Sequence, residues 1–179
     1  PIVLRGHDTD GGRVMEESLP IYKNLYTMSK YNGESLTTYE PRDSWESIPR
    51  ALSETGTLHI SNVHILANLE PFRYGSPDFI QKCVVAMHQI QKAKGIHLYP
   101  QASYWDWPYT ADKTEPRLFQ IDRDRIWYQA WGRYAWNCHR DRNLEIQYWT
   151  RILGEHYRCG ENGKYILEAY EETGEIAPK

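Results

Sequence analysis

The stretch Asn62-Val63-His64-Ile65-Leu66-Ala67-Asn68-Leu69 decides the class of fold. It is a nearly continuous apolar run bounded by more polar sequence. Such a run is typical of a parallel strand covered on both faces, because neither face of the strand then has to be polar. We therefore predict an α/β fold built around a parallel sheet.

Strand and helix signals alternate outward from this run. The segments that read as strands are 1–7, 35–40, 62–69 and 96–99. The segments that read as helices are about 18–28, 43–56, 76–95, 116–136, 140–157 and 161–172. Ser76-Pro77 is a clear helix start, and Gly95 is taken as the end of the same helix. No strand is expected between the last three helices.

Four βα units in series fit either an open doubly wound sheet or half of an eight-stranded barrel. The Gly-x-Gly-x-x-Gly motif of the dinucleotide-binding sheet is absent from the sequence. Polar residues instead follow successive strands, and in a barrel the C-terminal strand ends converge on one site. We predict the second half of a (β/α)8 TIM barrel over residues 1–137, followed by a C-terminal helical extension over 138–179. The apolar start of the chain leads us to expect that it is a piece of a longer polypeptide.

The composition excludes several classes of protein. The chain has 179 residues, 40% of them apolar and 25% charged, which is typical of a globular domain. Its apolar runs are shorter than the roughly 20 residues of a membrane-spanning helix, so no membrane partner is expected. A net charge of −3 without a basic stretch argues against nucleic acid as a partner. The content of 7 Trp and 14 Tyr against 3 Phe favours a wet or sugar-binding site.

Two glutamates, Glu40 and Glu70, are the candidate catalytic residues. Each follows a predicted strand and is itself followed by a proline and then by an arginine. Glycoside hydrolysis needs two carboxyl groups, one to protonate the leaving oxygen and one to activate water or to attack. The alternative is that each glutamate only pairs with its nearby arginine, Arg42 or Arg73.

Two loop motifs are candidate binding elements. His7-Asp8-x-Asp10 offers too few ligands for a metal, so contact with a substrate hydroxyl or carboxylate is expected, with loop capping as the alternative. Trp105-Asp106-Trp107 suits a sugar platform, with a packed loop at the barrel end as the alternative. The candidate substrate-binding residues read from the strand ends and loops are His7, Asp8, Asp10, Arg42, Asn68, Arg73, Trp105, Asp106 and Trp107.

Several stretches resemble, in order, the α-glucuronidases of glycoside hydrolase family 67. They are Ile2-Val3-Leu4-Arg5, Lys30-Tyr31-Asn32-Gly33 leading to Glu40-Pro41, the strand ending at Leu69-Glu70, and the helix 127–136 with Asn137 followed by Glu145-Ile146-Gln147-Tyr148-Trp149. The run Gly132-Arg133-x-Ala-Trp-Asn is the most specific of these. The chain is similar also to bacterial α-galacturonidases.

This resemblance implies an inverting hydrolase of α-linked uronic acid residues that needs no cofactor and no metal. Glu70 matches a carboxylate that activates water, and Glu40 is the nearest substitute for its Asp partner, which the sequence lacks. Arg5 resembles a strand arginine close to the sugar carboxylate, where its forked donors would suit a uronate. The general acid would precede Pro1. The implied partners are therefore a polysaccharide-derived uronide and the remaining half of the barrel, on another chain or on a missing N-terminal part.

Three other functions stay open at this point. A barrel that has lost its carboxylates would bind carbohydrate without cleaving it, and a complete hydrolase site would also suit a neutral sugar. An unrelated open α/β binding domain is the third. A uronide pocket should hold at least two of Arg5, His7, Arg42 and Arg73, because a desolvated carboxylate needs a charged partner.

Overall fold

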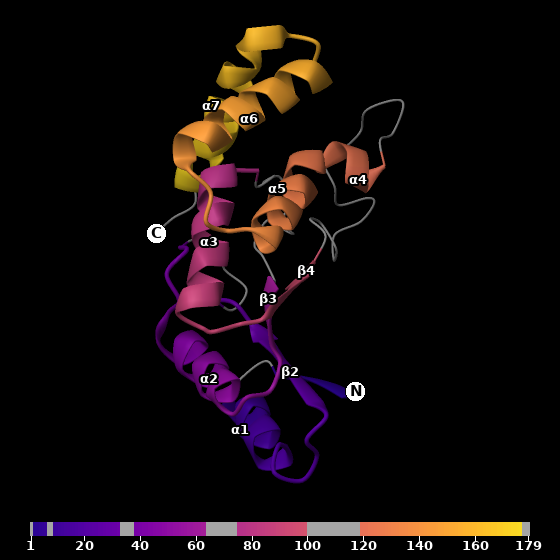
Figure 1. Cartoon of the computed structure of the whole chain (residues 1–179), viewed down its shortest axis with the longest axis vertical. Coiled ribbons are helices and arrows are strands. Elements are labelled where there is room, and N and C mark those ends of the chain that lie inside the picture. The colour runs from indigo at the N-terminus through magenta and orange to yellow at the C-terminus, as the bar shows by residue number, and fades with distance from the viewer. Residues whose placement is uncertain (1, 7–8, 33–37, 64–74, 100–118, 177–179) are drawn as a thin grey trace.

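The computed structural model describes residues 2–6, 9–32, 38–63, 75–99 and 119–176 (Figure 1). The strands are β1 (Ile2–Gly6), β2 (Leu25–Lys30), β3 (His59–Val63) and β4 (Gly95–Leu98). The helices are α1 (Thr9–Ser18), α2 (Asp43–Glu54), α3 (Pro77–Gln89), α4 (Gln120–Arg123), α5 (Arg125–Trp136), α6 (Arg142–His156), the 3-10 turn η2 (Gly160–Asn162) and α7 (Gly163–Ile176). Within these ranges no helix is long and apolar enough to cross a membrane.

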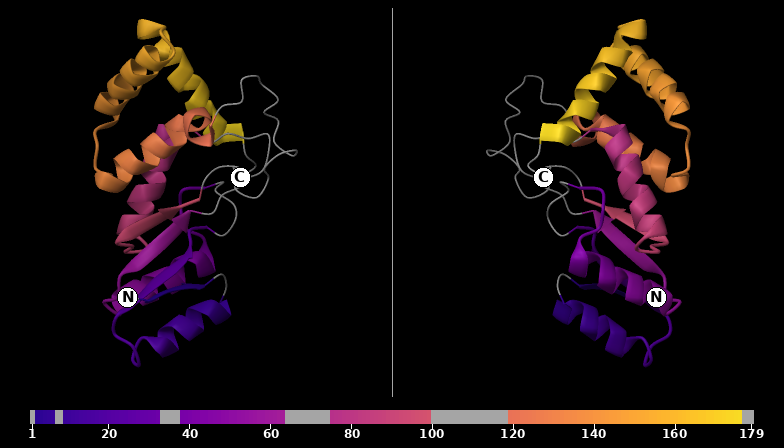
Figure 2. Two further views of the ribbon diagram at one scale, coloured as in Figure 1. Left: turned by 90° about the vertical axis from the view of Figure 1, so that its right-hand side faces the viewer. Right: turned by 90° about the vertical axis from the view of Figure 1, so that its left-hand side faces the viewer.

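The strands form one parallel sheet in the order β1-β2-β3-β4, so each strand pairs with the next one along the chain. Helices α1, α2 and α3 lie in a column along the sheet, and α5, α6 and α7 lie beyond them at one end of the molecule (Figures 1 and 2). The predicted parallel α/β sheet is confirmed. It arises because each strand returns to the same direction through a helix.

The register of the strands divides the side chains of the sheet between two faces. Arg5 pairs with Met28, and Lys30 pairs with Asn62, which in turn pairs with His97. Neighbours in register point to the same side of a pleated sheet, and side chains alternate along each strand. The helix-covered face carries Leu25, Thr27, Ser29, Tyr31, His59, Ser61 and Val63, which are at most 6% exposed. The second face carries Val3, Arg5, Met28, Lys30, Ile60, Asn62 and His97.

The apolar core lies between the helix-covered face and α3, α5, α6 and α7. Tyr31 and Val63 of the sheet belong to one buried cluster with Ile80, Trp127 and Trp149 from three of these helices. Ser76 begins α3 as predicted, because its hydroxyl accepts a hydrogen bond from the Phe79 N–H at 3.2 Å.

A buried histidine bridges two strands on the helix-covered face. His59 is fully buried, with its Nδ1 2.9 Å from the Thr27 hydroxyl and its Nε2 3.1 Å from the Ser29 hydroxyl. Burial lowers the pKa of His59 to about 4 from its ordinary value of 6.5, because the charged imidazolium would lose its hydration. The ring is therefore neutral in the folded protein at pH 7.

The buried His59 predicts that the protein loses stability in mild acid. The unfolded chain binds a proton at this ring below about pH 6.5, but the folded chain does so only near pH 4. The free energy of unfolding in urea should therefore fall by up to about 3 kcal/mol between those pH values. His59→Gln should flatten this dependence, whereas substitution of the exposed His156 by Gln should leave it unchanged. An equally steep dependence in His59→Gln would contradict the assignment.

One expected element in the first third of the chain is wrong. The helix expected over 18–28 does not form: Ile21 is 86% exposed and Leu25–Lys30 is strand β2. Both faces of β2 are largely buried, so apolar and polar residues do not alternate along it. Its apolar residues can therefore be mistaken for the apolar face of a helix. The helix lies earlier, at Thr9–Ser18, in a stretch whose glycines suggest a loop.

The boundaries of three other elements differ from those expected from the sequence. Residues 38–40 are not a strand, while 35–37 of the expected strand 35–40 lie outside the described residues. The third strand begins earlier than expected, at His59, and 64–69 lie outside the described part. Helix α3 ends at Gln89, and Gly95 begins β4 instead of ending the helix. A turn through Lys92, with φ of 56°, separates the two elements.

An ion pair joins α5 to α6. Arg133 donates two hydrogen bonds to the carboxylate of Glu145, from Nε at 2.7 Å and from Nη2 at 2.8 Å, and its guanidinium lies over the Tyr148 ring. Glu145 is 1% exposed. Burial acts to raise the pKa of this carboxyl, but the hydrogen bonds and charge of Arg133 outweigh it and hold the pKa below its usual value. Beside this pair, the Trp149 indole donates to the Tyr134 hydroxyl at 2.9 Å.

Helix α7 is tied to α3 and α6 through Glu171. Its carboxylate accepts from the Ser76 hydroxyl at 2.6 Å and from the Asp78 N–H at 3.2 Å, at the N-terminus of α3. Arg142 of α6 donates to the same carboxylate at 3.0 Å. Helices α6 and α7 are therefore both tied to the N-terminal end of α3, and the separation of 138–179 as an extension stays a prediction.

The Arg133–Glu145 pair predicts a large loss of stability when one partner is neutralised. Glu145→Gln leaves the Arg133 charge without its partner in a mostly buried position, which should cost about 3 kcal/mol in the free energy of unfolding. Glu155→Gln is the control, because its i,i+4 pair with Arg151 is exposed and should contribute less than about 1 kcal/mol. Equal effects of the two variants on urea unfolding would refute the role given to the buried pair.

Candidate functional site

Five side chains lie on the second face of the sheet near the C-terminal ends of the strands. They are Arg5, Lys30, Asn62, His97 and Tyr99, which we call the strand-end cluster. The first four lie at the last or next-to-last position of β1, β2, β3 and β4, and Tyr99 follows β4. Because the strands are parallel and in register, their C-terminal ends lie at one edge of the sheet, which is where parallel sheets commonly bind ligands.

Asn62 is the centre of this cluster. It is fully buried. Its Oδ1 accepts hydrogen bonds from Arg5 Nε at 3.2 Å and from Arg5 Nη2 at 3.0 Å. Its Nδ2 lies 2.8 Å from His97 Nδ1 and donates to the His97 carbonyl at 3.2 Å. One amide therefore links the first, third and fourth strands.

Tyr99 contacts two other members of the cluster. Its ring lies edge-on to the His97 ring, with centroids 5.3 Å apart, and the Arg5 guanidinium lies 5.6 Å from the Tyr99 centroid. Such a cation–π contact is favourable and keeps the arginine at the strand end. Arg5, Asn62, His97 and Tyr99 thus form a closed ring of contacts.

The charge of the cluster suits an anionic or hydroxyl-rich ligand. Arg5 and Lys30 are cations, and Lys30 is only 4% exposed. Arginine presents a planar fork of donors that matches a carboxylate. A tyrosine ring beside these donors supplies the apolar surface that sugar rings pack on.

The sequence predicted Arg5 and missed the other four members. The residues predicted from the sequence follow the strand ends, whereas Lys30, Asn62 and His97 lie within strands. The signal that could have found His97 and Tyr99 is their alternation with Ile96 and Leu98. Asn62 and Lys30 sit in strands buried on both sides, where no such alternation is visible.

Glu40 lies on the other side of the sheet from the cluster. With Asp78, Lys82 and Arg142 it borders a groove of about 380 Å3 beside α3. Tyr31 is buried on the helix-covered face, and this burial raises the pKa of its phenol. Cys83 and the negative charge of Glu40 raise the pKa further, so Glu40 lies near the same face. Its backbone carbonyl accepts from Asn32 Nδ2 at 3.0 Å.

Two further predicted residues are described. Asp10 is exposed in the first turn of α1, and Arg42 is the N-cap of α2, with its backbone N–H donating to Asn32 Oδ1 at 3.0 Å. The predicted residues His7, Asp8, Asn68, Glu70, Arg73, Trp105, Asp106 and Trp107 lie outside the described residues. No group of three or more His, Cys, Asp or Glu able to hold a metal occurs in the described ranges.

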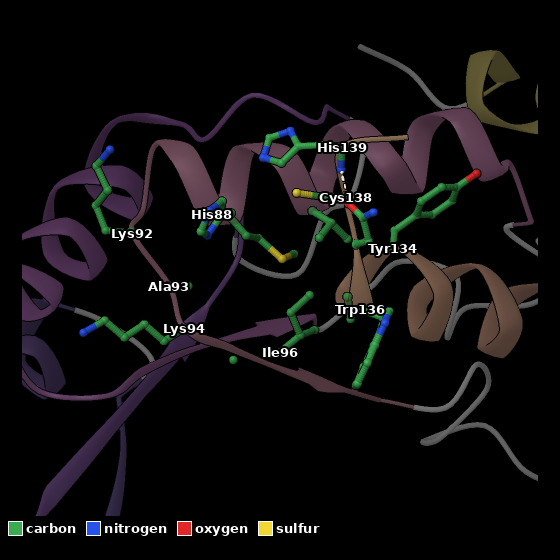
Figure 3. A pocket seen from close by; sticks show the side chains of 14 residues that line it. His88, Lys92, Ala93, Lys94, Ile96, Tyr134, Trp136, Cys138 and His139 are labelled. Carbon is green, nitrogen blue, oxygen red and sulfur yellow. Dashed lines mark hydrogen bonds between the residues drawn. The ribbon is translucent and has the colours of Figure 1, made fainter. Parts of the chain in front are cut away.

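A cavity of about 640 Å3 lies between α3, β4 and the end of α5 (Figure 3). Its wall includes Met87, Ile96 and Trp136, and Ile96 pairs with Ser61 on the face of the sheet opposite the cluster. The side chains of Lys92 and Lys94 extend away from Ile96 and Trp136 (Figure 3). The lining also includes His88 and His139, so this cavity combines apolar and basic side chains and lies on the other face of the sheet from the strand-end cluster.

Comparison with known proteins identifies a similar solved structure. It is that of a GH138 enzyme targeting pectin rhamnogalacturonan II, with 58% sequence identity and a TM-score of 0.90 over 99% of this chain. The chain spans about a quarter of that protein, 26% of its length. No family model and no curated protein matches the sequence.

The comparison corrects the family suggested by the sequence. The similar structure is a glycoside hydrolase but not a family 67 α-glucuronidase. The motif that carried the family 67 resemblance includes Arg133 and, further on, Glu145, which form the structural ion pair between α5 and α6. In this structure these two residues hold two helices together, and they lie outside the strand-end cluster.

Proposed function

We propose that this chain is a segment of a glycoside hydrolase that acts on a pectic polysaccharide, and that the strand-end cluster is part of its sugar-binding site. The observation that carries the proposal is the 58% identity to a GH138 enzyme over nearly the whole chain. The match covers 99% of the chain and so includes both the strand ends and the core, which makes a shared chemistry the simplest expectation. The position and charge of the strand-end cluster support it independently.

We further propose that the sheet is the second half of a (β/α)8 barrel over 1–137, with 138–179 as a helical extension. Four consecutive parallel strands carry helices on one face, as barrel strands do. The second face is covered less completely at the edge strand β1, where Val3 is 46% exposed. The remaining strands would come from the rest of the enzyme, and they would pair with β1 and β4.

The proposed substrate is a uronide. A rhamnogalacturonan is by its name a polymer of rhamnose and galacturonate, and Arg5 and Lys30 would balance a galacturonate carboxylate at the strand ends. In an inverting reaction, a carboxylate takes a proton from water as the oxygen attacks the anomeric carbon, and an acid protonates the leaving oxygen. We propose Glu70 for the carboxylate and expect the acid on the rest of the enzyme.

Glu70→Gln and Glu40→Gln form a matched pair that tests the carboxylate assignment. In the full enzyme acting on rhamnogalacturonan II oligosaccharides, Glu70→Gln should lower kcat at least about 100-fold, because glutamine cannot accept the proton from water. Glu40 borders α3, so Glu40→Gln should stay within about threefold of wild type. An equal loss in both variants would restore the paired-glutamate assignment, and unchanged turnover in Glu70→Gln would refute the mechanism.

The uronide preference has its own test. Reduction of the substrate carboxylate to an alcohol should lower kcat/KM strongly in the wild type and little in Arg5→Met, because the charge partner is already lost. Arg13→Met is the control, since Arg13 is exposed on α1 in a pair with Glu17. Equal kcat/KM for the uronide and its reduced form in the wild type would indicate a neutral-sugar hydrolase. Tight binding without any turnover would indicate the non-catalytic carbohydrate-binding barrel.

A further inference from the structure

The amide of Asn62 has a chemically fixed orientation. Arginine is a donor only, and two Arg5 donors lie at 3.0 and 3.2 Å from one end of the amide, so that end is the oxygen. The other end is therefore the NH2 group. It also donates to the backbone carbonyl of His97, which confirms the same orientation from a second acceptor.

This orientation determines where His97 carries its ring proton. The Asn62 NH2 group lies 2.8 Å from His97 Nδ1 and can only donate, so Nδ1 must accept and carries no proton. The ring proton then resides on Nε2. Full burial of Asn62 and the in-register pairing of Asn62 with His97 keep the two groups together.

The Nε2–H group points away from Asn62. The two ring nitrogens lie on opposite sides of the imidazole, and the His97 side chain is exposed. No partner for Nε2 occurs among the described residues. The ring is held edge-on by Tyr99, which itself contacts Arg5, so the donor sits beside the cationic strand end.

We propose that His97 donates a hydrogen bond from Nε2 to a sugar oxygen, and that Asn62 is the positioning residue that fixes this donor. An oriented N–H beside Arg5 and Lys30 adds a directional contact to two charges. Such a contact recognises a hydroxyl or carboxylate oxygen at one position of a sugar ring. The identity of the ligand rests on the proposed function, whereas the ring tautomer does not.

The tautomer is tested directly by NMR on the full enzyme labelled with 15N at histidine. The His97 signals, assigned by their loss in His97→Gln, should show a bare Nδ1 and a protonated Nε2. Asn62→Asp replaces the donor by an acceptor of the same shape, so His97 should then donate from Nδ1 and expose a bare Nε2. His139→Gln, a change at an exposed ring outside the cluster, should leave the His97 signals as they are.

Kinetics test the contact with the sugar. Asn62→Asp and His97→Asn should each lower kcat/KM for a pectic oligosaccharide about tenfold, the loss expected for one hydrogen bond. His97→Gln should recover part of that loss, because its amide NH2 reaches the position of Nε2. His139→Gln should have wild-type kcat/KM. If Asn62→Asp fails to fold, the two His97 variants still decide the question.

The outcomes separate the inference from the proposed function. A protonated Nδ1 in wild-type His97 would overturn the role of Asn62. The predicted tautomer with unchanged kcat/KM in all the variants would overturn the sugar contact. The predicted tautomer in a protein that neither binds nor cleaves pectic oligosaccharides would overturn the proposed function and its ligand, and would leave the Asn62–His97 pairing standing.

Discussion

The in-register pairing of the parallel strands is the constraint on which the site depends. Lys30, Asn62 and His97 occupy one row across β2, β3 and β4, so their side chains emerge together on the second face. A slip of one residue would turn these polar groups toward α3 and would move Tyr31 and Val63 out of the core. The same register therefore produces the core on one side and the strand-end cluster on the other.

The helices hold this register from the covered side. Tyr31 and Val63 pack with α3, and α3 is in turn fixed at its N-terminus by Glu171 of α7. The buried Arg133–Glu145 pair then joins α5 to α6. Residues far beyond the sheet in sequence thus help to set the position of the strands that carry the site.

The general architecture was predictable because it depends on long, repeated patterns. The apolar run near Asn62 indicated a parallel strand, and Ser76-Pro77 marked the start of α3. Strand β2 was missed because both of its faces are buried, which removes the alternation that distinguishes a strand from a helix. The position of Glu40 beside α3 depends on the loop after β2, and local sequence does not determine where such a loop lies.

The site was only partly predictable for a related reason. Arg5 was found through a resemblance, while Lys30, Asn62 and His97 gain their significance from pairing between strands that are distant in sequence. The hydrolase class suggested by the sequence agrees with the similar GH138 structure, but the family did not, since its most specific motif reflects helix packing.

The most direct test of the central claim is a crystal structure of the full enzyme, inactivated by Glu70→Gln, with a bound rhamnogalacturonan II oligosaccharide. The account predicts a sugar oxygen within hydrogen-bonding distance of Arg5, Lys30 or His97 at the strand ends. A sugar seated instead in the cavity beside Ile96 and Trp136, or in the groove at Glu40, with the strand-end cluster empty, would contradict it.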